Sequence, residues 1–320
     1  MPVKIALVTP AAAGSRSGNR VTAIRWERIL RKLGHQVSIS VDEPDPSADL
    51  LIAIHAWRSA NAVAKFRLAA PSKPVLVLLA GTDIYKFQYA QPELTLATMR
   101  SANLLIGLHD RVANDIPAEF AAKLRIIRQS LEPSDIPRSP SENELEVCVV
   151  GHLREEKDPF RAALATEQLP STSAIRVVHL GGAHSDEWAA MARVHEARNP
   201  RYVWHGELAP EQVRACYAHS HAMIISSIME GGANVVSEAI VDGLAVLASD
   251  ISGNRGLLGD NHPAYFPPGD TQALARLMQR FELDGEFVSA IRANAAEQAP
   301  RFQPRLELQA WQEALAEVCG

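Results

Sequence analysis

Short apolar runs rich in Val, Ile and Leu alternate with segments of helical periodicity along the whole chain. Such runs are typical of strands buried on both faces of a parallel sheet. The predicted strands of the first half are Val3–Val8, Val37–Val41, Leu50–Ile54, Pro74–Leu79, Leu104–Leu108 and Leu124–Ile127. Those of the second half are Val147–Val150, Ile175–Leu180, Tyr202–Trp204, Ala222–Ser226 and Leu244–Ser249. The alternation predicts an α/β fold of two doubly wound, Rossmann-like domains with right-handed crossovers.

Between the first two strands lies a helix with an expected cap at each end. Asn19 can cap its start and Gly34 can end it. Its expected apolar stripe is Val21, Ile24, Ile29, Leu30 and Leu33. Further helices are predicted at Pro159–Glu167, Asp186–Arg198 and Arg305–Val318.

Proline and polar residues mark a boundary between the two series of strands. Residues 132–144 hold three prolines in Glu132–Ser141 and lack periodicity, which is typical of a linker. We therefore expect domains at 1–131 and 145–300, with a C-terminal helix in 301–320 that packs back on the first. The carboxyl ends of both sheets should meet a central cleft, because ligands of doubly wound folds bind at those ends.

Composition narrows the class of protein. The 320 residues are 47% hydrophobic and 22% charged, with a net charge of -5 and a pI near 6.1. The chain therefore lacks a basic field for nucleic acid or an anionic membrane. It also lacks the roughly 20 apolar residues in a row that span a bilayer. Cys148, Cys216 and Cys319 are odd in number and not in metal-ligand spacing, so we expect buried thiols and a cytoplasmic protein.

The most informative stretch for ligand binding is Ser226–Gly243. A predicted strand runs into Glu230, Gly231, Gly232 and Ala233, and Asn234 can cap the helix that follows. Glycine backbone can approach a ligand closely, and free amides at a helix start favour a pyrophosphate. Glu238, one turn into the helix, can reach a ribose diol. The alternative is that Glu230 caps the helix and Glu238 is a solvated helix residue.

A second charged segment follows the strand at Val147–Val150. It contains His152, Arg154 and Lys157, whose positive charges could bind an anion. Alternatively, residues 154–157 are a solvated run of charges.

Three post-strand turns of the first half carry the candidate acceptor residues. After the first strand come Gly14, Arg16, Asn19 and Arg20, and later turns carry His55, Thr82 and Asp83. Glycines, hydroxyls and arginines at a helix start form a small anion cradle. The alternatives are a polar loop that only caps its helix and a structural histidine at His55.

These segments resemble the group 1 retaining glycosyltransferases, which have the GT-B fold. Glu230 and Glu238 match the Glu-x7-Glu element of that family, and Gly151–Lys157 is similar to its Gly-Arg-Leu-x-x-x-Lys element. The resemblance implies that Glu230 contacts the donor sugar, Glu238 the ribose and Lys157 the diphosphate. His152 stands where the family has arginine, so either His152 or Arg154 is the second cation; Arg154 is favoured because it is always charged. Members of this family often carry a histidine just before the glycine of the turn at Gly81, whereas this chain has Ala80 at that position.

The set formed by Thr9–Ala11, Gly14–Thr22, Gly81–Asp83, Gly151–Pro159 and Glu230–Asn234 resembles one subgroup, the selenosugar synthases of selenoneine biosynthesis. This resemblance implies transfer of a sugar, N-acetylglucosamine, from its UDP donor to selenophosphate. We expect no metal or other cofactor, because no Asp-x-Asp element precedes a donor loop and Lys157 and Arg154 can meet the leaving group. The rival functions are a transferase making an ordinary O-glycoside, a nucleotide-sugar epimerase and a catalytically silent nucleotide-sugar sensor. A dehydrogenase is disfavoured because the Gly-x-Gly-x-x-Gly fingerprint is missing. The oligomeric state is left open.

Overall fold

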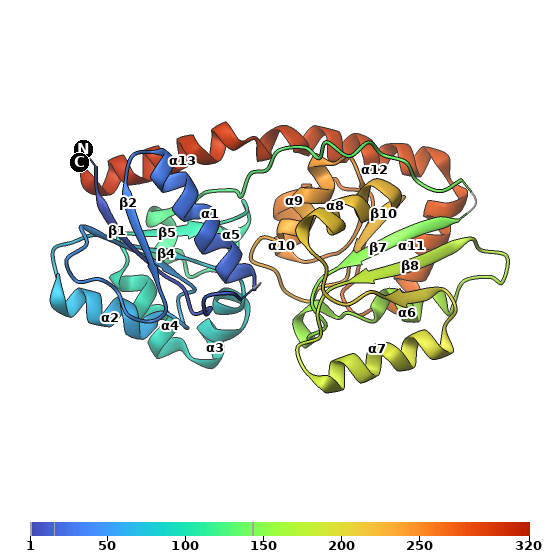
Figure 1. The fold of residues 1–320 in the computed structure, drawn as a ribbon, viewed down its shortest axis with the longest axis horizontal. Coiled ribbons are helices and arrows are strands. Elements are labelled where there is room, and N and C mark those ends of the chain that lie inside the picture. The colour runs from blue at the N-terminus through green and yellow to red at the C-terminus, as the bar shows by residue number, and fades with distance from the viewer. Residues whose placement is uncertain (1, 16, 143) are drawn as a thin grey trace. The chain divides into compact units, whose positions relative to one another are not determined.

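Two six-stranded sheets, with all strand pairs parallel, carry the fold (Figure 1). The computed structural model describes residues 2–15, 17–142 and 144–320. It divides into two compact units. The described residues of Met1–Ser130, Glu230–Gly232 and Pro304–Gly320 form the first, and those of Leu131–Met229 and Ala233–Gln303 form the second. The predicted α/β fold with two doubly wound sheets is confirmed.

The sheet of the first unit has the strand order β2-β1-β3-β4-β5-β6. Its strands are β1 (Lys4–Val8), β2 (Gln36–Ser40), β3 (Leu50–Ile54), β4 (Val75–Leu78), β5 (Leu104–Gly107) and β6 (Leu124–Ile126). Its helices are α1 (Gly18–Lys32), α2 (Ala60–Ala69), α3 (Gln88–Ala90), α4 (Pro92–Ser101), α5 (Val112–Asp115) and α13 (Pro304–Cys319). Short helical turns occupy η1 (Asp83–Phe87) and η2 (Ala118–Lys123).

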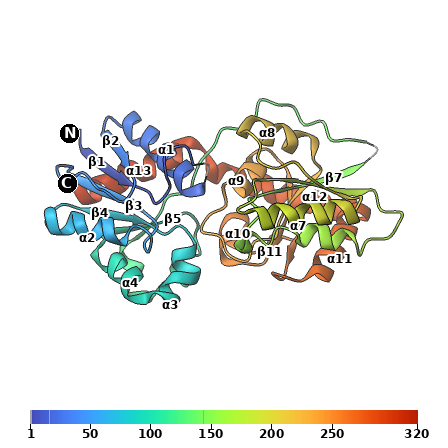
Figure 2. The same cartoon turned by 60° about the horizontal axis from the view of Figure 1, so that its bottom comes forward.

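Helices cover both faces of this sheet. Figures 1 and 2 show α1 and α13 against one face and α2 and α4 against the other. Trp26 of α1 and Trp311 of α13 are fully buried and meet edge to face, with ring centroids 4.7 Å apart. Arg25 donates two hydrogen bonds to the buried carboxylate of Glu307, at 3.0 and 2.9 Å. These contacts fix α13 on the first sheet.

The sheet of the second unit has the order β12-β11-β10-β7-β8-β9. Its strands are β7 (Leu145–Val150), β8 (Ile175–Leu180), β9 (Tyr202–Trp204), β10 (Ala222–Ile225), β11 (Ala245–Ser249) and β12 (Tyr265–Phe266). Its helices are α6 (Arg161–Thr166), α7 (Asp186–Arg198), α8 (Pro210–His219), α9 (Asn234–Val241), α10 (Ser252–Leu258), α11 (Thr271–Leu283) and α12 (Gly285–Gln298). The turns η3 (Glu155–Lys157) and η4 (Ala299–Phe302) complete it. One apolar cluster packs α6, α7 and α11 on the sheet and another packs α8, α9 and α10.

Helix starts differ from the sequence-based expectation. The N-cap position of α1 is Ser17 and that of α9 is Ala233, so the predicted capping by Asn19 and Asn234 is wrong. Both asparagines lie inside the first turn, because each helix begins at or before them. Val21 is 44% exposed, so the predicted apolar stripe of α1 is also wrong there. Its buried residues are Thr22, Ala23, Trp26 and Leu30.

Helices α1 and α9 both end at a glycine, as the sequence predicts for Gly34. Gly34 and Gly243 follow α1 and α9 with φ of +91° and +67°, the left-handed conformation that glycine adopts without strain.

The segment expected as a linker is held against the second unit. The backbone N–H of Ser139 donates to the carbonyl of Ala218 at 2.8 Å, and Arg138 donates to the carbonyl of Ser220 at 2.8 Å. Among the cysteines, Cys148 is buried but Cys319 is exposed, which corrects the expectation for the latter. No helix within the described residues is long and apolar enough to cross a membrane.

Candidate active site

The strand order of the second sheet reverses between β7 and β10, and such a reversal is where doubly wound folds bind ligands. Gly151 follows β7 and Ser226 follows β10 at this point. Together with Lys157 and Ser227 they line a small pocket. The structure therefore gathers the predicted Lys157 with two serines that sequence reasoning did not single out.

Hydrogen bonds tie the two loops of this pocket together. The Ser226 hydroxyl donates to the backbone carbonyls of Lys157 and Asp158, at 3.2 and 2.9 Å. The backbone N–H of Ile228 donates to the carbonyl of Glu156 at 3.0 Å. The backbone that carries Lys157 is thus fixed to the loop after β10, which reduces the entropy lost when a ligand binds.

His179 of β8 fixes the other side of the pocket. Its Nε2 donates to the Gly151 carbonyl at 3.0 Å, and its Nδ1 accepts from the Tyr202 hydroxyl at 2.9 Å. Burial lowers the pKa of His179 to about 4. The ring is therefore neutral at pH 7, as this pair of bonds requires.

His152 and Arg154 differ in their ability to supply positive charge. Burial and then the neighbouring Arg154 lower the pKa of His152, which favours its neutral form. The side chain of Arg154 is 38% exposed and its Nε lies 3.9 Å from a carboxylate oxygen of Glu156. That Nε is buried without a hydrogen-bond partner in the part of the chain that the structure describes.

Helix α9 begins directly after the double glycine. Its N-cap residue, Ala233, has no side-chain oxygen, so its own side chain leaves the first amides of the helix uncapped. Glu238 is half-buried on α9, and its Oε2 accepts a hydrogen bond from the Tyr217 hydroxyl at 3.2 Å. Glu230 is 9% exposed; it belongs with Gly231 and Gly232 to the first unit, whereas we expected all of 145–300 in one domain.

The predicted acceptor residues follow strands of the first sheet. The strand order of that sheet reverses between β1 and β3. Gly14 is exposed with a φ of +83°. Asn19 and Arg20 are half-buried on α1, and the Nε of Arg20 is buried without a partner among the described residues. The predicted Arg16 lies outside the described residues.

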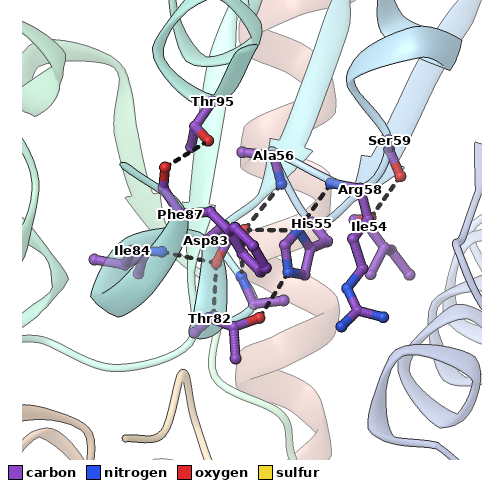
Figure 3. A network of polar contacts seen from close by, with 12 residues as sticks. Ile54, His55, Ala56, Arg58, Ser59, Thr82, Asp83, Ile84, Phe87 and Thr95 are labelled. Atoms are coloured by element: carbon purple, nitrogen blue, oxygen red, sulfur yellow. Dashed lines mark hydrogen bonds and ion pairs between the residues drawn. The ribbon is translucent and has the colours of Figure 1, made fainter. Parts of the chain in front are cut away.

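His55, Thr82 and Asp83 form one network at this edge (Figure 3). The Nδ1 of His55 accepts from the backbone N–H of Arg58 at 3.1 Å, so its Nε2 donates to the Thr82 hydroxyl at 2.8 Å. Burial lowers the pKa of His55, which keeps it neutral. Its φ of +78° is rare for a residue other than glycine, and such strain is concentrated at functional sites.

The buried carboxylate of Asp83 joins the turns after β3 and β4. Its oxygens accept from the backbone N–H groups of Ala56, Ala80, Gly81 and Ile84 at 2.8 to 3.1 Å. Because backbone donors use both oxygens of the carboxylate, Asp83 positions the two turns relative to each other. Direct contact between Asp83 and the acceptor stays a prediction.

Two features of this edge were missed from the sequence. The rings of Trp57 and Phe87 stack with centroids 3.8 Å apart and planes 9° apart. His109, after β5, is fully buried, and its Nδ1 has no partner in the described chain. Burial, with Arg128 and Arg111 nearby, lowers its pKa to about 4. Neither carries a sequence signal, because both depend on which turns fold together.

Comparison with known proteins shows the family to which this chain belongs. Residues 133–298 match the family of group 1 glycosyl transferases, and the chain belongs to that family. It is 24% identical over 280 residues to TuaC of Bacillus subtilis, described as a teichuronic acid biosynthesis glycosyltransferase, covering 81% of this chain and 68% of TuaC.

Solved structures share the fold. Sucrose-phosphate synthase from Thermosynechococcus elongatus superimposes with a TM-score of 0.82 at 17% identity, covering 99% of each chain. HepE of Anabaena, in complex with UDP and glucose, gives 0.79 at 17% identity, covering 98% of this chain and 100% of HepE. Both are glycosyltransferases of the GT-B fold, and this chain has that fold.

Proposed function

We propose that this chain transfers N-acetylglucosamine from a UDP-sugar to selenophosphate. Family membership makes it a glycosyltransferase, and the HepE neighbour holds UDP-glucose in one of its structures. The observation that carries the donor assignment is the strand reversal of the second sheet, where Lys157 lies beside Gly151 and Ser226. A diphosphate bound over this edge would meet a cation and backbone amides, and α9 begins in the segment that follows β10.

The reaction breaks the bond between the anomeric carbon and the diphosphate oxygen. Selenium of selenophosphate supplies the electron pair for the new carbon–selenium bond, and UDP leaves with the old pair. Water then cleaves the selenium–phosphorus bond and releases phosphate. Lys157 and Arg154 stabilise the charge that develops on UDP, which is electrostatic catalysis by fixed groups. We assign the second cation to Arg154 because the lowered pKa of His152 favours its neutral form.

The acceptor would lie against the start of α1. Gly14, Asn19 and Arg20 would form the anion cradle, to which the sequence adds Arg16, and the network of His55 and Thr82 lies after the neighbouring strand. Selenophosphate is a strong nucleophile, so it needs a general base less than a hydroxyl acceptor does. This fits the neutral, fully hydrogen-bonded state of His55.

A second candidate is transfer to a sugar hydroxyl. The stacked rings of Trp57 and Phe87 favour it, because an aromatic surface at the acceptor edge suits the apolar face of a sugar ring.

Release of UDP from UDP-N-acetylglucosamine separates the two candidates. We expect release with selenophosphate, slower release with its sulfur analogue thiophosphate, and none above background with glucose. A chelator should leave the rate unchanged, since Lys157 and Arg154 supply the positive charge. Release with glucose and not with selenophosphate would establish the O-glycoside reaction instead.

A further inference from the structure

Asp158, the residue directly after Lys157, has a backbone conformation that is rare outside glycine. Its φ of +43° and ψ of +56° lie in the left-handed region. A residue with a Cβ adopts this region at a cost, and such strain is concentrated at functional sites. Pro159 follows, and a residue before proline is disfavoured from the right-handed helical region. The extended region is therefore the conformation to which Asp158 would relax.

A bidentate ion pair holds the side chain of Asp158. The Nε and Nη2 of Arg161 donate to its Oδ2 and Oδ1 at 2.8 and 3.2 Å. The Nη1 of Arg161 donates to the Thr271 hydroxyl at 2.6 Å. Both charged side chains are 20% exposed, so water and salt screen this pair less than a pair on the open surface. Asp158 is thus tied to Arg161 and Thr271, the first residues of α6 and α11.

The backbone carbonyl of Asp158 is held as well. It accepts hydrogen bonds from the Ser226 hydroxyl at 2.9 Å and from the backbone N–H of Arg161 at 3.2 Å. A change of φ and ψ at Asp158 re-orients this carbonyl, so relaxation to the extended region would break both bonds. The left-handed conformation therefore persists because the surrounding groups fix both ends of the residue.

The side chain of Lys157 depends on this conformation. A Cβ at Gly151 would lie 3.7 and 3.9 Å from Cδ and Cγ of Lys157, so the stem of Lys157 lies over Gly151. A rotation of the backbone at Asp158 would shift that stem. We propose that Arg161 is a positioning residue of the donor site, which keeps Lys157 over Gly151 by holding Asp158 in its left-handed conformation. This inference rests on the proposed role of Lys157 in binding the diphosphate.

Calorimetric titration of the full chain with UDP and with uridine tests this role. Uridine lacks the diphosphate that Lys157 would contact, so a displaced Lys157 should weaken the binding of UDP alone. We expect Arg161→Gln to weaken UDP about tenfold and to leave uridine unchanged. The matched control is Arg176→Gln, which removes an ion pair with Glu144 at the amino end of β8 and should change neither affinity.

Asp158→Gly separates the backbone strain from the ion pair, because glycine adopts a positive φ without strain. In the Asp158→Gly background we expect Arg161→Gln to change the affinity for UDP by less than about twofold. Asp158→Ala loses the ion pair and keeps the strain, so we expect it to bind UDP about fivefold more weakly than Asp158→Gly. This second comparison tests the inference even if Arg161→Gln fails to fold.

Three results would overturn the inference. Unchanged UDP binding in Arg161→Gln would show that Lys157 keeps its place without the ion pair. Equal weakening of UDP in both backgrounds would show that Arg161 acts other than through Asp158. Equal weakening of UDP and uridine would show that the whole site, and not Lys157, is disturbed.

Lys157→Ala distinguishes these results from a failure of the proposed function. We expect it to weaken UDP at least as much as Arg161→Gln does and to leave uridine unchanged. If Lys157→Ala binds UDP as tightly as the wild type, the proposed role of Lys157 is contradicted, and the role of Arg161 falls with it. If Lys157→Ala weakens UDP and Arg161→Gln does not, only the role of Arg161 is contradicted.

Discussion

Replacing Glu238 separates its contribution to nucleotide binding from its contribution to the fold. Glu238 is half-buried on α9 and accepts a hydrogen bond from the Tyr217 hydroxyl, which is fully buried. Glu238→Ala would remove the proposed bonds to the ribose and leave the Tyr217 hydroxyl without its acceptor. Glu238→Gln keeps an acceptor for Tyr217 but removes the charge.

The magnitudes differ between the two variants. A hydrogen bond to a charged group contributes about 1.5–3 kcal/mol, so Ala should weaken UDP binding roughly 10- to 150-fold. Charge-assisted bonds are about twice as strong as neutral ones, so Gln should lose about half of that free energy. In Glu238→Ala the buried Tyr217 hydroxyl loses its hydrogen-bond acceptor, which should lower the free energy of unfolding by about 1–3 kcal/mol. Glu238→Gln keeps an acceptor and should not show this loss.

Calorimetric titration with UDP and chemical denaturation measure these two effects. Tyr217→Phe is a matched control, expected to cost about 1 kcal/mol of stability with a small effect on UDP. Glu187→Gln, an exposed position on α7, should change neither quantity. A folded Glu238→Ala protein that binds UDP as tightly as the wild type would refute the donor assignment.

The remaining predictions concern the acceptor, the second cation and pH. Arg20→Ala should raise the Michaelis constant for selenophosphate roughly ten- to thirtyfold in initial-rate assays, with UDP affinity nearly intact; lower stability with unchanged acceptor kinetics would mean that this loop only supports its helix. Arg154→Gln should lower kcat and His152→Gln should not, because the pKa of His152 is already lowered; the reverse pattern would assign the cation to His152. The pKa of His179 is about 4 in the fold and about 6.5 unfolded, so the unfolded state binds more protons between these values and stability is lost as pH falls through that window. Between pH 7 and 5, the free energy of unfolding of His179→Asn should therefore fall by about 2 kcal/mol less than that of the wild type. Parallel curves of unfolding free energy against pH for the two proteins would contradict this pKa.

Most strands were predictable because a short run rich in Val, Ile and Leu indicates a strand that is buried on both faces of a sheet. Leu50–Ile54, buried at every position, matches its observed bounds, as do Ile175–Leu180 and the partly buried edge strand Tyr202–Trp204. The edge strand Tyr265–Phe266 was missed, since two residues carry no periodicity. Capping by Asn19 and Asn234 was predicted wrongly, because the residue that caps is set by where the backbone enters the helix, which composition does not report.

The candidate site was predictable only as far as local sequence determines it. Lys157 and Glu238 could be singled out from spacing and resemblance. The positive φ of His55 and the pairing of Trp57 with Phe87 arise in turns that follow separate strands. Such contacts arise from tertiary structure, so one sequence without it gives no signal for them.

The mass spectrum of the product shows whether selenophosphate accepts the sugar. After incubation of the chain with UDP-N-acetylglucosamine and selenophosphate, we expect UDP and a product with the selenium isotope pattern and one N-acetylhexosamine. Unconsumed selenophosphate, with N-acetylglucosamine transferred to a sugar hydroxyl under the same conditions, would contradict it.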